Sequence, residues 1–401
     1  MKILLMYPLL GYFGGREEYL IDLVRELPQR GHDCFLVYEQ LTGRPPSENL
    51  STSIASYEIP ILTEYQTRWD KKYSNMLTKI LENESPDVIF LSDIKNFALL
   101  QLLNEFGRVV SMAHHGWLFC LRNARTLYFS RNACYRKLGV GCYRQGCFLK
   151  KREQGAGFPL RYNSLSDRKK LVALYSKIRK HLVTSQYMKD LFLQHGFKDE
   201  QVQKTSLYTR VPPPSHIESP RNRGSILFVG RIDRYKGVDF LLRTLVLLRR
   251  PFTCKIIGDG PYLDHCKKLL RKLGLENKVF FLGWLPHAEI SIHLSNATVL
   301  VVPSILPEAF GIAGIEAMVH AKPVVGFDTG GISEWLKDGK TGYLIPYKDV
   351  VMMASKIDCL LEDEQLARQL GLAGQKLVAE EFNIDKHFTQ LISTFEEAAK
   401  T

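Results

Sequence analysis

Two glutamates frame the start of a segment whose spacing predicts a helix. Glu308 precedes Gly311, where the helix would begin, and Glu316 lies about two turns inside it. The N-terminus of a helix presents unpaired backbone N–H groups and binds anions. At about 1.5 Å rise per residue the two carboxylates are about 12 Å apart, comparable to the span from one sugar across a diphosphate to another. Each could accept hydrogen bonds from sugar hydroxyls, although the spacing alone is also typical of two glutamates on a helix surface.

A pair of cations forms the second candidate element of a site. Arg231 and Lys236 lie in a loop between a predicted strand and a predicted helix, where together they could clamp a diphosphate. Glycines end or follow neighbouring strands at Gly258, Gly283 and Gly330, and a ligand could approach the backbone there. Ligands of open α/β sheets bind outside the carboxyl ends of the strands, so these segments are expected to gather at one edge.

The elements that must position these residues alternate between strands and helices. In the first half, apolar runs predict strands over 2–7, 34–38, 87–91, 109–113 and 181–184, with a helix over 97–106. In the second half they predict strands over 226–230, 254–258, 279–283, 299–303 and 323–327, and helices over 237–249, 262–273, 286–295 and 311–321. A last helix is predicted over 384–399. Consecutive prolines predict a linker over 211–223, which joins two doubly wound α/β domains.

Length and composition agree with two globular domains. The chain has 401 residues, of which 45% are hydrophobic and 24% are charged, and these values exclude a disordered or fibrous protein. No run of 18 apolar residues occurs, so no membrane-spanning helix is expected. The apolar start lacks a small-residue cleavage site and is interpreted as a buried first strand, not as a signal peptide.

Positive charge is concentrated in one region. The net charge is +12, and residues 108–189 hold 18 basic side chains against two acidic ones. Such a field favours an anionic partner, which could be a nucleic acid, an acidic membrane surface or a polyanionic substrate. The alternative is a solvated basic face that keeps the protein soluble. Within this region, residues 118–165 are basic, aromatic and poorly periodic, and they predict an insertion that carries short helices.

Four cysteines lie within or beside this insertion. The intervals between Cys120, Cys134, Cys142 and Cys147 are 13, 7 and 4 residues, and only the last interval is typical of a zinc site. Free thiols are therefore favoured, while a zinc knuckle stays an alternative. A reducing cytosol is the expected compartment, because no secretory signal is recognised.

All these motifs occur together in one known family. The chain resembles the retaining glycosyltransferases of family 4, which have the GT-B fold. The resemblance rests on VGRIDRYKGVDFLL, IIGDGP, VFFLGW, VVPSILPEAFGIAGIEAM, AKPVVGFDTGGISEWLKDGKTGYLIP and the Gly-Gly-x-Glu loop at 14–17. It implies two doubly wound Rossmann-like domains facing a central cleft. Residues 1–211 would bind the acceptor, residues 212–382 would bind the nucleotide sugar, and a terminal helix within 383–401 would pack back on the first domain.

The resemblance also implies roles for individual residues. Arg231 and Lys236 would bind the diphosphate, Glu308 would contact donor-sugar hydroxyls and stabilise positive charge on the ring, and Glu316 would hold the ribose hydroxyls. The other donor-binding positions would be Gly15, Gly230, Gly258, Leu285, Phe310, Gly311 and Ile312. The leaving phosphate would act as the base, so no protein nucleophile is implied. No metal or cofactor is expected, because two cations and a helix N-terminus can neutralise the leaving diphosphate.

His114 is the remaining candidate for a catalytic role. Aligned on Trp117 and Cys120, it takes the position of the family's histidine and would bond a donor-sugar hydroxyl or line the reaction centre. His115 replaces the family's aspartate, so a pairing of His114 with a neighbouring carboxylate is not implied. The alternative interpretation is a packed histidine near the hinge.

The predicted function is a retaining transfer of a hexose from a nucleotide-diphosphate sugar, UDP-linked by family habit, to an anionic or lipid-linked glycan. The acceptor would be of the cell-surface polysaccharide or lipopolysaccharide type, and the candidate residues for binding it are Arg122, Arg125, Arg131 and Lys137. The expected location is the cytoplasm, with peripheral association to the inner face of the membrane as an extension. No nucleic acid is expected as a partner, although a nucleic-acid-binding module driven by residues 108–189 stays an alternative, as does a GT-B synthase with a small acceptor. Donor sugar, base, linkage and oligomeric state are not predicted.

Overall fold

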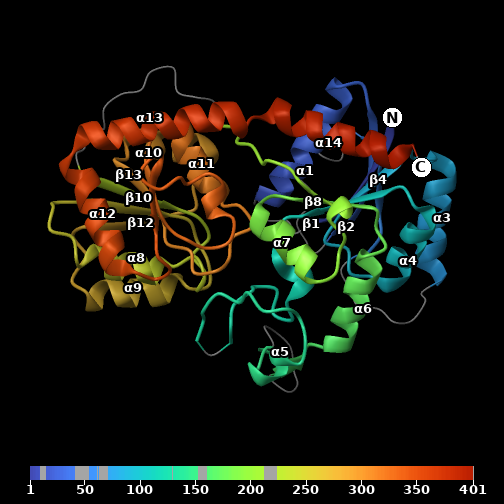
Figure 1. The fold of residues 1–401 in the computed structure, drawn as a ribbon, viewed down its shortest axis with the longest axis horizontal. Coiled ribbons are helices and arrows are strands. Elements are labelled where there is room, and N and C mark those ends of the chain that lie inside the picture. Colours follow the sequence, from blue (N-terminus) through green and yellow to red (C-terminus); the bar gives the residue numbers. More distant parts are fainter. Residues whose placement is uncertain are drawn as a thin grey trace. The chain divides into compact units, whose positions relative to one another are not determined.

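The chain divides into two compact units in the computed structural model, which describes residues 1–9, 15–40, 54–60, 62, 71–128, 130–151, 160–211 and 224–400. Each unit is built on its own parallel sheet (Figure 1). Unit 1 comprises Met1–Ala124, Arg136–Thr205 and Phe388–Thr401. Unit 2 comprises Arg125–Tyr135 and Ser206–His387. The predicted linker lies outside the described residues from 212 to 223.

Unit 1 is built around a seven-stranded sheet in the order β3-β2-β1-β4-β5-β8-β9, and every pairing in it is parallel. Its central strand β4 is buried along its whole length, and residues 3–8 of β1 and 109–112 of β5 are buried beside it, as expected for a parallel sheet covered on both faces. The strands of this sheet are β1 (Lys2–Leu9), β2 (Asp33–Gln40), β3 (Ser56–Glu58), β4 (Val88–Ser92), β5 (Val109–Ala113), β8 (Lys180–Val183) and β9 (Val202–Lys204). The helices are α1 (Gly15–Gln29), α3 (Lys71–Glu84), α4 (Phe97–Phe106), α6 (Leu165–Tyr175) and α7 (Gln186–Gln194).

Unit 2 has a six-stranded parallel sheet in the order β12-β11-β10-β13-β14-β15. The strands are β10 (Ser225–Val229), β11 (Thr253–Ile257), β12 (Val279–Gly283), β13 (Val299–Val302), β14 (Val324–Phe327) and β15 (Gly342–Ile345). The helices are α8 (Val238–Leu245), α9 (Leu263–Lys272), α10 (His287–Asn296), α11 (Ile312–Val319), α12 (Val350–Glu362) and α13 (Glu364–Glu381). The chain order of the strands reverses between β10 and β13, so the prediction of a doubly wound α/β protein is confirmed.

The insertion in the first half differs from its prediction in two ways. Besides the short helices η1 (Gly116–Phe119) and α5 (Gly141–Arg144), it contains an antiparallel pair of strands, β6 (Leu149–Lys151) and β7 (Leu160–Tyr162). Strands of three residues are too short for an alternating pattern to be recognised. In addition, residues 125–135 belong to unit 2, whereas the predicted boundary placed everything before 211 in one domain.

The terminal helix α14 (Ile384–Ala399) has the bounds that its sequence predicts, and from Phe388 onward it belongs to unit 1. Phe395 is buried and meets the ring of Phe90 edge-on, with 5.2 Å between the ring centroids. Lys180 Nζ lies 2.7 Å from Glu397 Oε1. Apolar contact with the sheet and an ion pair beside it therefore hold the last helix on unit 1. Among the helices of the described ranges, none is both long and apolar enough to cross a membrane.

His181 on β8 makes unit 1 sensitive to acid. Its Nε2 lies 3.0 Å from the carbonyl oxygen of Tyr175. Because a carbonyl oxygen can only accept a hydrogen bond, Nε2 carries the proton of the ring. Nδ1 therefore accepts a hydrogen bond from the Ser111 hydroxyl at 2.5 Å. Burial lowers the pKa of His181 to about 3, whereas an unfolded histidine titrates near 6.5. The unfolded chain therefore binds an extra proton below pH 6.5, and stability falls as the pH falls from there.

Because of this histidine, we expect the free energy of unfolding to fall by about 2–3 kcal/mol when the pH is lowered from 7.5 to 4.5. Urea unfolding of the wild type and of His181→Gln at both pH values measures it. The variant should lose less stability on acidification, by that amount, because an amide does not titrate. An equal loss in both proteins would show that His181 is not the acid-sensitive group.

Candidate active site

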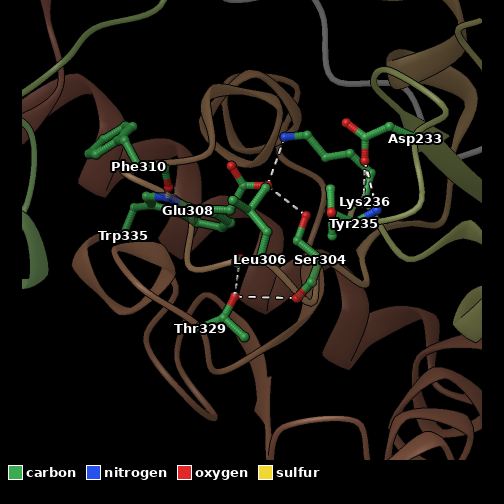
Figure 2. Close-up of polar contacts among 9 residues, drawn as sticks. All are labelled: Asp233, Tyr235, Lys236, Ser304, Leu306, Glu308, Phe310, Thr329 and Trp335. Carbon is green, nitrogen blue, oxygen red and sulfur yellow. Dashed lines mark hydrogen bonds and ion pairs between the residues drawn. The ribbon is translucent and has the colours of Figure 1, made fainter. Parts of the chain in front are cut away.

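The loops that follow β10 and β13 meet where the strand order of unit 2 reverses. The first loop carries Lys236 and the second carries Glu308. Lys236 Nζ lies 2.7 Å from Glu308 Oε1, and this ion pair joins the two loops (Figure 2). Ligands of doubly wound sheets bind at such a reversal, so the location agrees with the predicted donor site.

The Lys236–Glu308 pair is held in a charged state. The side chain of Glu308 is 10% exposed and that of Lys236 is 29% exposed. Burial alone lowers the pKa of the Lys236 ammonium, but the Glu308 carboxylate, with a smaller contribution from Asp233, reverses this and raises the pKa. Ser304 Oγ donates to the same Oε1 at 2.6 Å, so in the described residues Glu308 Oε2 is left available for a ligand hydroxyl.

The loop after β10 is shaped by its own side chains. Asp233 Oδ1 accepts hydrogen bonds from the backbone N–H groups of Tyr235 at 2.7 Å and Lys236 at 3.0 Å. Gly237, at the start of α8, has φ of 75°, and a Cβ there would lie 1.8 Å from the carbonyl oxygen of Pro303. Only glycine can occupy this position without displacing the backbone of the loop after β13.

The loop after β13 is fixed by hydrogen bonds to its backbone. Thr329 Oγ1 donates to the carbonyl oxygens of Ser304 at 3.3 Å and Leu306 at 3.2 Å. The N–H of Gly331 donates to the carbonyl oxygen of Glu308 at 2.7 Å. Figure 2 shows the two Thr329 contacts beside the carboxylate. Ser304 and Thr329 were not predicted, because a hydroxyl that bonds a nearby carboxylate or backbone carbonyl carries no spacing signal.

Trp335 supports the approach to α11. Its indole Nε1 donates to the carbonyl oxygen of Phe310 at 2.7 Å, and its ring packs so closely against Gly314 that a Cβ there would lie 2.0 Å from it. Gly311 takes a positive φ of 91° at the N-terminus of α11. Trp335 was not predicted as a site residue, although a tryptophan in the segment that follows the Gly-Gly motif offered a weak signal.

The other predicted donor residues lie in unit 2, with the exception of Gly15. Gly258 and Gly230 pack together, and a Cβ on Gly258 would lie 2.0 Å from the carbonyl oxygen of Gly230. Arg231 is exposed, and the described residues offer its side chain no partner. Glu316 is half-buried on α11. Ile312 is the first residue of α11, and Leu285 follows β12 and is half-buried. Gly15 lies in unit 1, where it is the first residue of α1.

His114 lies at the end of β5 in unit 1 and is packed between two tyrosines. Its Nε2 lies 3.1 Å from the hydroxyl oxygen of Tyr7, and its ring meets Tyr19 edge-on at 5.2 Å. The carboxylate at this strand end belongs to Asp93, and its Oδ2 lies 3.5 Å from Nε2 of His115. The structure thus places the second histidine, His115, beside a carboxylate.

Two of the four predicted acceptor-binding residues, both arginines, do not belong to unit 1. Arg125 is buried in unit 2, and Arg131 Nη1 lies 3.7 Å from Asp239 Oδ2 in the same unit. Their placement on a basic surface of the first domain is therefore wrong, because their guanidinium groups pack within the second unit. Arg122 and Lys137 lie in unit 1, and Lys137 is exposed.

The cysteines of the insertion are free thiols. Cys134 lies in unit 2 and the other three lie in unit 1. Over the described ranges, no three His, Cys, Asp or Glu side chains are gathered so that they could hold a metal ion. The structure therefore gives no support to a zinc knuckle in that part of the chain.

Both halves of the chain match models of glycosyltransferase families. Residues 13–203 match the model described as Glycosyltransferase Family 4, and residues 215–377 match the model described as Glycosyl transferases group 1. The crystal structure of Anabaena Alr3699/HepE in complex with UDP superposes with a TM-score of 0.74 at 20% identity, over 99% of this chain and 100% of that one. The fold is GT-B. Its two parallel-sheet α/β domains are units 1 and 2.

Curated relatives match this GT-B chain over shorter lengths. The alpha-D-kanosaminyltransferase of Streptomyces kanamyceticus is 30% identical over 44% of this chain and 46% of its own length. The GDP-mannose-dependent alpha-(1-6)-phosphatidylinositol monomannoside mannosyltransferase of Mycolicibacterium smegmatis is 33% identical over 38% of this chain and 43% of its own length. The chain thus spans less than half the length of each of these relatives. Fold, family models and relatives together support a GT-B glycosyltransferase.

Proposed function

We propose that the protein transfers a hexose from a nucleotide-diphosphate sugar to a glycan, with retention of configuration. The observation that carries this proposal is the ion pair between Lys236 and Glu308 at the strand-order reversal of unit 2. A cation and a carboxylate held together there can bind the two parts of such a donor, the diphosphate and the sugar. Lys236 and the exposed Arg231 bind the diphosphate, and Glu308 accepts hydrogen bonds from the sugar hydroxyls through Oε2.

The proposed chemistry places developing charge beside fixed charges. As the bond from the sugar to the phosphate breaks, positive charge grows on the ring and the Glu308 carboxylate stabilises it. Lys236, Arg231 and the N-terminus of α11 stabilise the negative charge on the departing diphosphate. A phosphate oxygen takes the proton of the acceptor hydroxyl, so no protein nucleophile is needed. We propose that no metal ion takes part, because these groups supply the positive charge.

The donor base that we propose is uracil, and the ribose hydroxyls would be held by Glu316. Support comes from the similarity in fold to Alr3699/HepE, which was solved with UDP. For the acceptor we propose an anionic or lipid-linked glycan, because residues 108–189 hold 18 basic side chains against two acidic ones. The exposed Lys137, together with Arg122, is the proposed acceptor contact in unit 1. Such an acceptor fits a cytoplasmic protein that associates with the inner face of the membrane.

A thermal-shift panel of nucleoside diphosphates, with and without EDTA, tests the donor site. One nucleotide should stabilise the wild type, by about 2.7 kcal/mol at a hundred times its dissociation constant, and EDTA should not change the shift. Glu316→Ala should lose the shift, measured against its own nucleotide-free protein. The exposed Glu380→Ala on α13 is the matched control and should keep it. No shift with any nucleotide in the wild type would refute the proposed function.

The stereochemical outcome needs a separate measurement. Once the panel has identified the base, the corresponding nucleotide sugars are supplied with a synthetic lipid-linked glycan. The anomeric configuration of the product is then read from the proton NMR coupling of the transferred sugar. Retention gives the configuration of the donor, and an inverted product would contradict the proposed mechanism.

A further inference from the structure

A segment of the first half of the sequence folds into unit 2 as a small hairpin. We call residues 125–135 the hairpin; of these, residue 129 is not described. Thr126 and Ala133 form an antiparallel bridge, and the N–H of Cys134 donates to the carbonyl oxygen of Arg125 at 2.7 Å. The chain belongs to unit 1 on both sides of it, at Ala124 and at Arg136. The hairpin is thus a part of unit 2 that is tied covalently to unit 1 at both ends.

Arg131 of the hairpin contacts the loop after β10 and the helix that follows it. Nη2 donates to the carbonyl oxygen of Arg234 at 2.6 Å, within the loop that carries Lys236. Nη1 lies 3.7 Å from Oδ2 of Asp239, a buried carboxylate in the first turn of α8. The guanidinium also lies over the ring of Tyr262, 5.4 Å from its centroid. One side chain therefore contacts both the predicted diphosphate-binding loop and the first turn of the helix that follows it.

The C-terminal arm of the hairpin reaches the loop after β13. The N–H of Ala133 donates to the Tyr347 hydroxyl at 2.8 Å, and that hydroxyl donates to the carbonyl oxygen of Ile305 at 3.1 Å. The N–H of Ile305 in turn donates to the carbonyl oxygen of Tyr235 at 2.8 Å. Ile305 follows Ser304, which bonds Glu308, so this chain of bonds ends beside the catalytic carboxylate.

The last residue of the hairpin contacts a third loop. The Tyr135 hydroxyl lies near the backbone of Gly330, which acts to lower its pKa while burial raises it. Gly330 is packed so tightly that a Cβ there would lie 2.2 Å from the carbonyl oxygen of Glu308. The next residue, Gly331, donates its N–H to that same oxygen at 2.7 Å. The hairpin thus lies against each loop that fixes Lys236 or Glu308, and it is hydrogen-bonded to the loop after β10 and, through Tyr347, to the loop after β13.

We propose that the hairpin positions the donor site. Arg131 is a positioning residue: it keeps the loop after β10 in the conformation that presents Lys236 to the diphosphate. The inference rests on the proposed function and adds to it a residue from a distant part of the sequence. Without Arg131 the loop loses the hydrogen bond to the carbonyl oxygen of Arg234, and the first turn of α8 loses the ion pair of Asp239. A diphosphate must then order the loop as it binds, and this cost appears as weaker affinity.

The test is a calorimetric titration with the nucleoside diphosphate that the panel identifies and with the matching monophosphate. Arg131→Ala should weaken diphosphate binding about tenfold. It should also lower the ratio of diphosphate affinity to monophosphate affinity, because the loop after β10 carries Lys236, which is proposed to bind the diphosphate. Arg131→Lys keeps a charge opposite Asp239 and should recover part of the loss. Arg243→Ala, which removes an exposed arginine from the same helix as Asp239, is the matched control and should bind as the wild type does.

A second measurement uses the wild type alone and does not depend on how well a variant folds. Since coupling between two sites is reciprocal, a bound diphosphate should slow hydrogen exchange in peptides that cover 125–135. Asp239→Asn, which removes the charge partner but keeps the side-chain shape, should reduce this protection. No protection of the hairpin in a wild type that binds the nucleotide overturns the inference and leaves the proposed function intact.

The outcomes separate the two proposals. If Arg131→Ala melts at a lower temperature but binds the diphosphate like the wild type, the hairpin is only structural and the inference is wrong. If the wild type binds no nucleoside diphosphate, the proposed function fails and the inference fails with it. Both proposals hold if three results are found together. The wild type binds the nucleoside diphosphate, Glu316→Ala does not bind it, and Arg131→Ala binds it about tenfold more weakly than the wild type.

Discussion

Glu308→Gln is expected to slow sugar transfer by about 10²–10³-fold while leaving the affinity for the nucleoside diphosphate within severalfold of the wild type. The substitution keeps the shape of the side chain and an oxygen that can accept from Ser304 and Lys236. It removes the negative charge that would stabilise the sugar ring as the bond to phosphate breaks. Each tenfold loss of rate corresponds to about 1.4 kcal/mol of transition-state stabilisation.

Steady-state kinetics and calorimetry on the same preparations check this result. The loss should fall on kcat, because the charge acts in the transition state, and much less on nucleotide binding. Glu380→Gln, on an exposed position of α13, is the control for removing a carboxylate and should be as active as the wild type. A loss of kcat below tenfold would show that Glu308 does not meet the developing charge.

Lys236→Ala is expected to weaken nucleoside diphosphate binding by about 30–100-fold and also to destabilise unit 2. The binding loss corresponds to one charge-assisted contact of about 2–3 kcal/mol. The stability loss, about 2 kcal/mol, arises because the buried Glu308 side chain is left without its lysine partner. Calorimetric titration measures the first effect and urea unfolding measures the second.

The double variant Lys236→Ala with Glu308→Gln separates these two effects. It removes the buried unpaired carboxylate, so it should regain part of the lost stability, but it lacks the cation and should not regain affinity. A single variant that binds the diphosphate normally would show that Lys236 serves only as the counter-ion of Glu308. The diphosphate contact would then have to come from Arg231.

The central pair of the site was predictable because its residues are marked by type and place. Lys236 and Glu308 each follow an apolar strand, and the rule that ligands bind at carboxyl ends of parallel strands brings their loops to one edge. Ser304 was missed because it acts on the Glu308 carboxylate, and Thr329 and Trp335 were missed because they act on backbone carbonyls. Any hydroxyl or indole in the segment could have done so. Only the tertiary structure shows which one does.

The fold of the second half was predictable for the same reason, and part of the first half was not. Continuous apolar runs marked most strands of both sheets, but not β3, β9 and β15, which are short and only partly buried. The hairpin was misread because a run of basic residues is typical of a charged surface. In the structure the charge of Arg131 is matched by Asp239, and no local pattern indicates a pairing between residues so far apart in sequence. The short strands β6 and β7 lacked enough residues for a period to appear.

The path of the chain through the two units constrains how the protein can be made. The chain passes between the units four times, after residues 124, 135, 205 and 387. During synthesis the sheet of unit 1 is complete long before α14 exists, so Phe90 lacks the ring of Phe395 until that helix has been made. Conversely, the hairpin leaves the ribosome well before the loops that it contacts in unit 2. Domains of many proteins fold one after another as they emerge, but in this chain the first domain finishes packing only after the second has been synthesised.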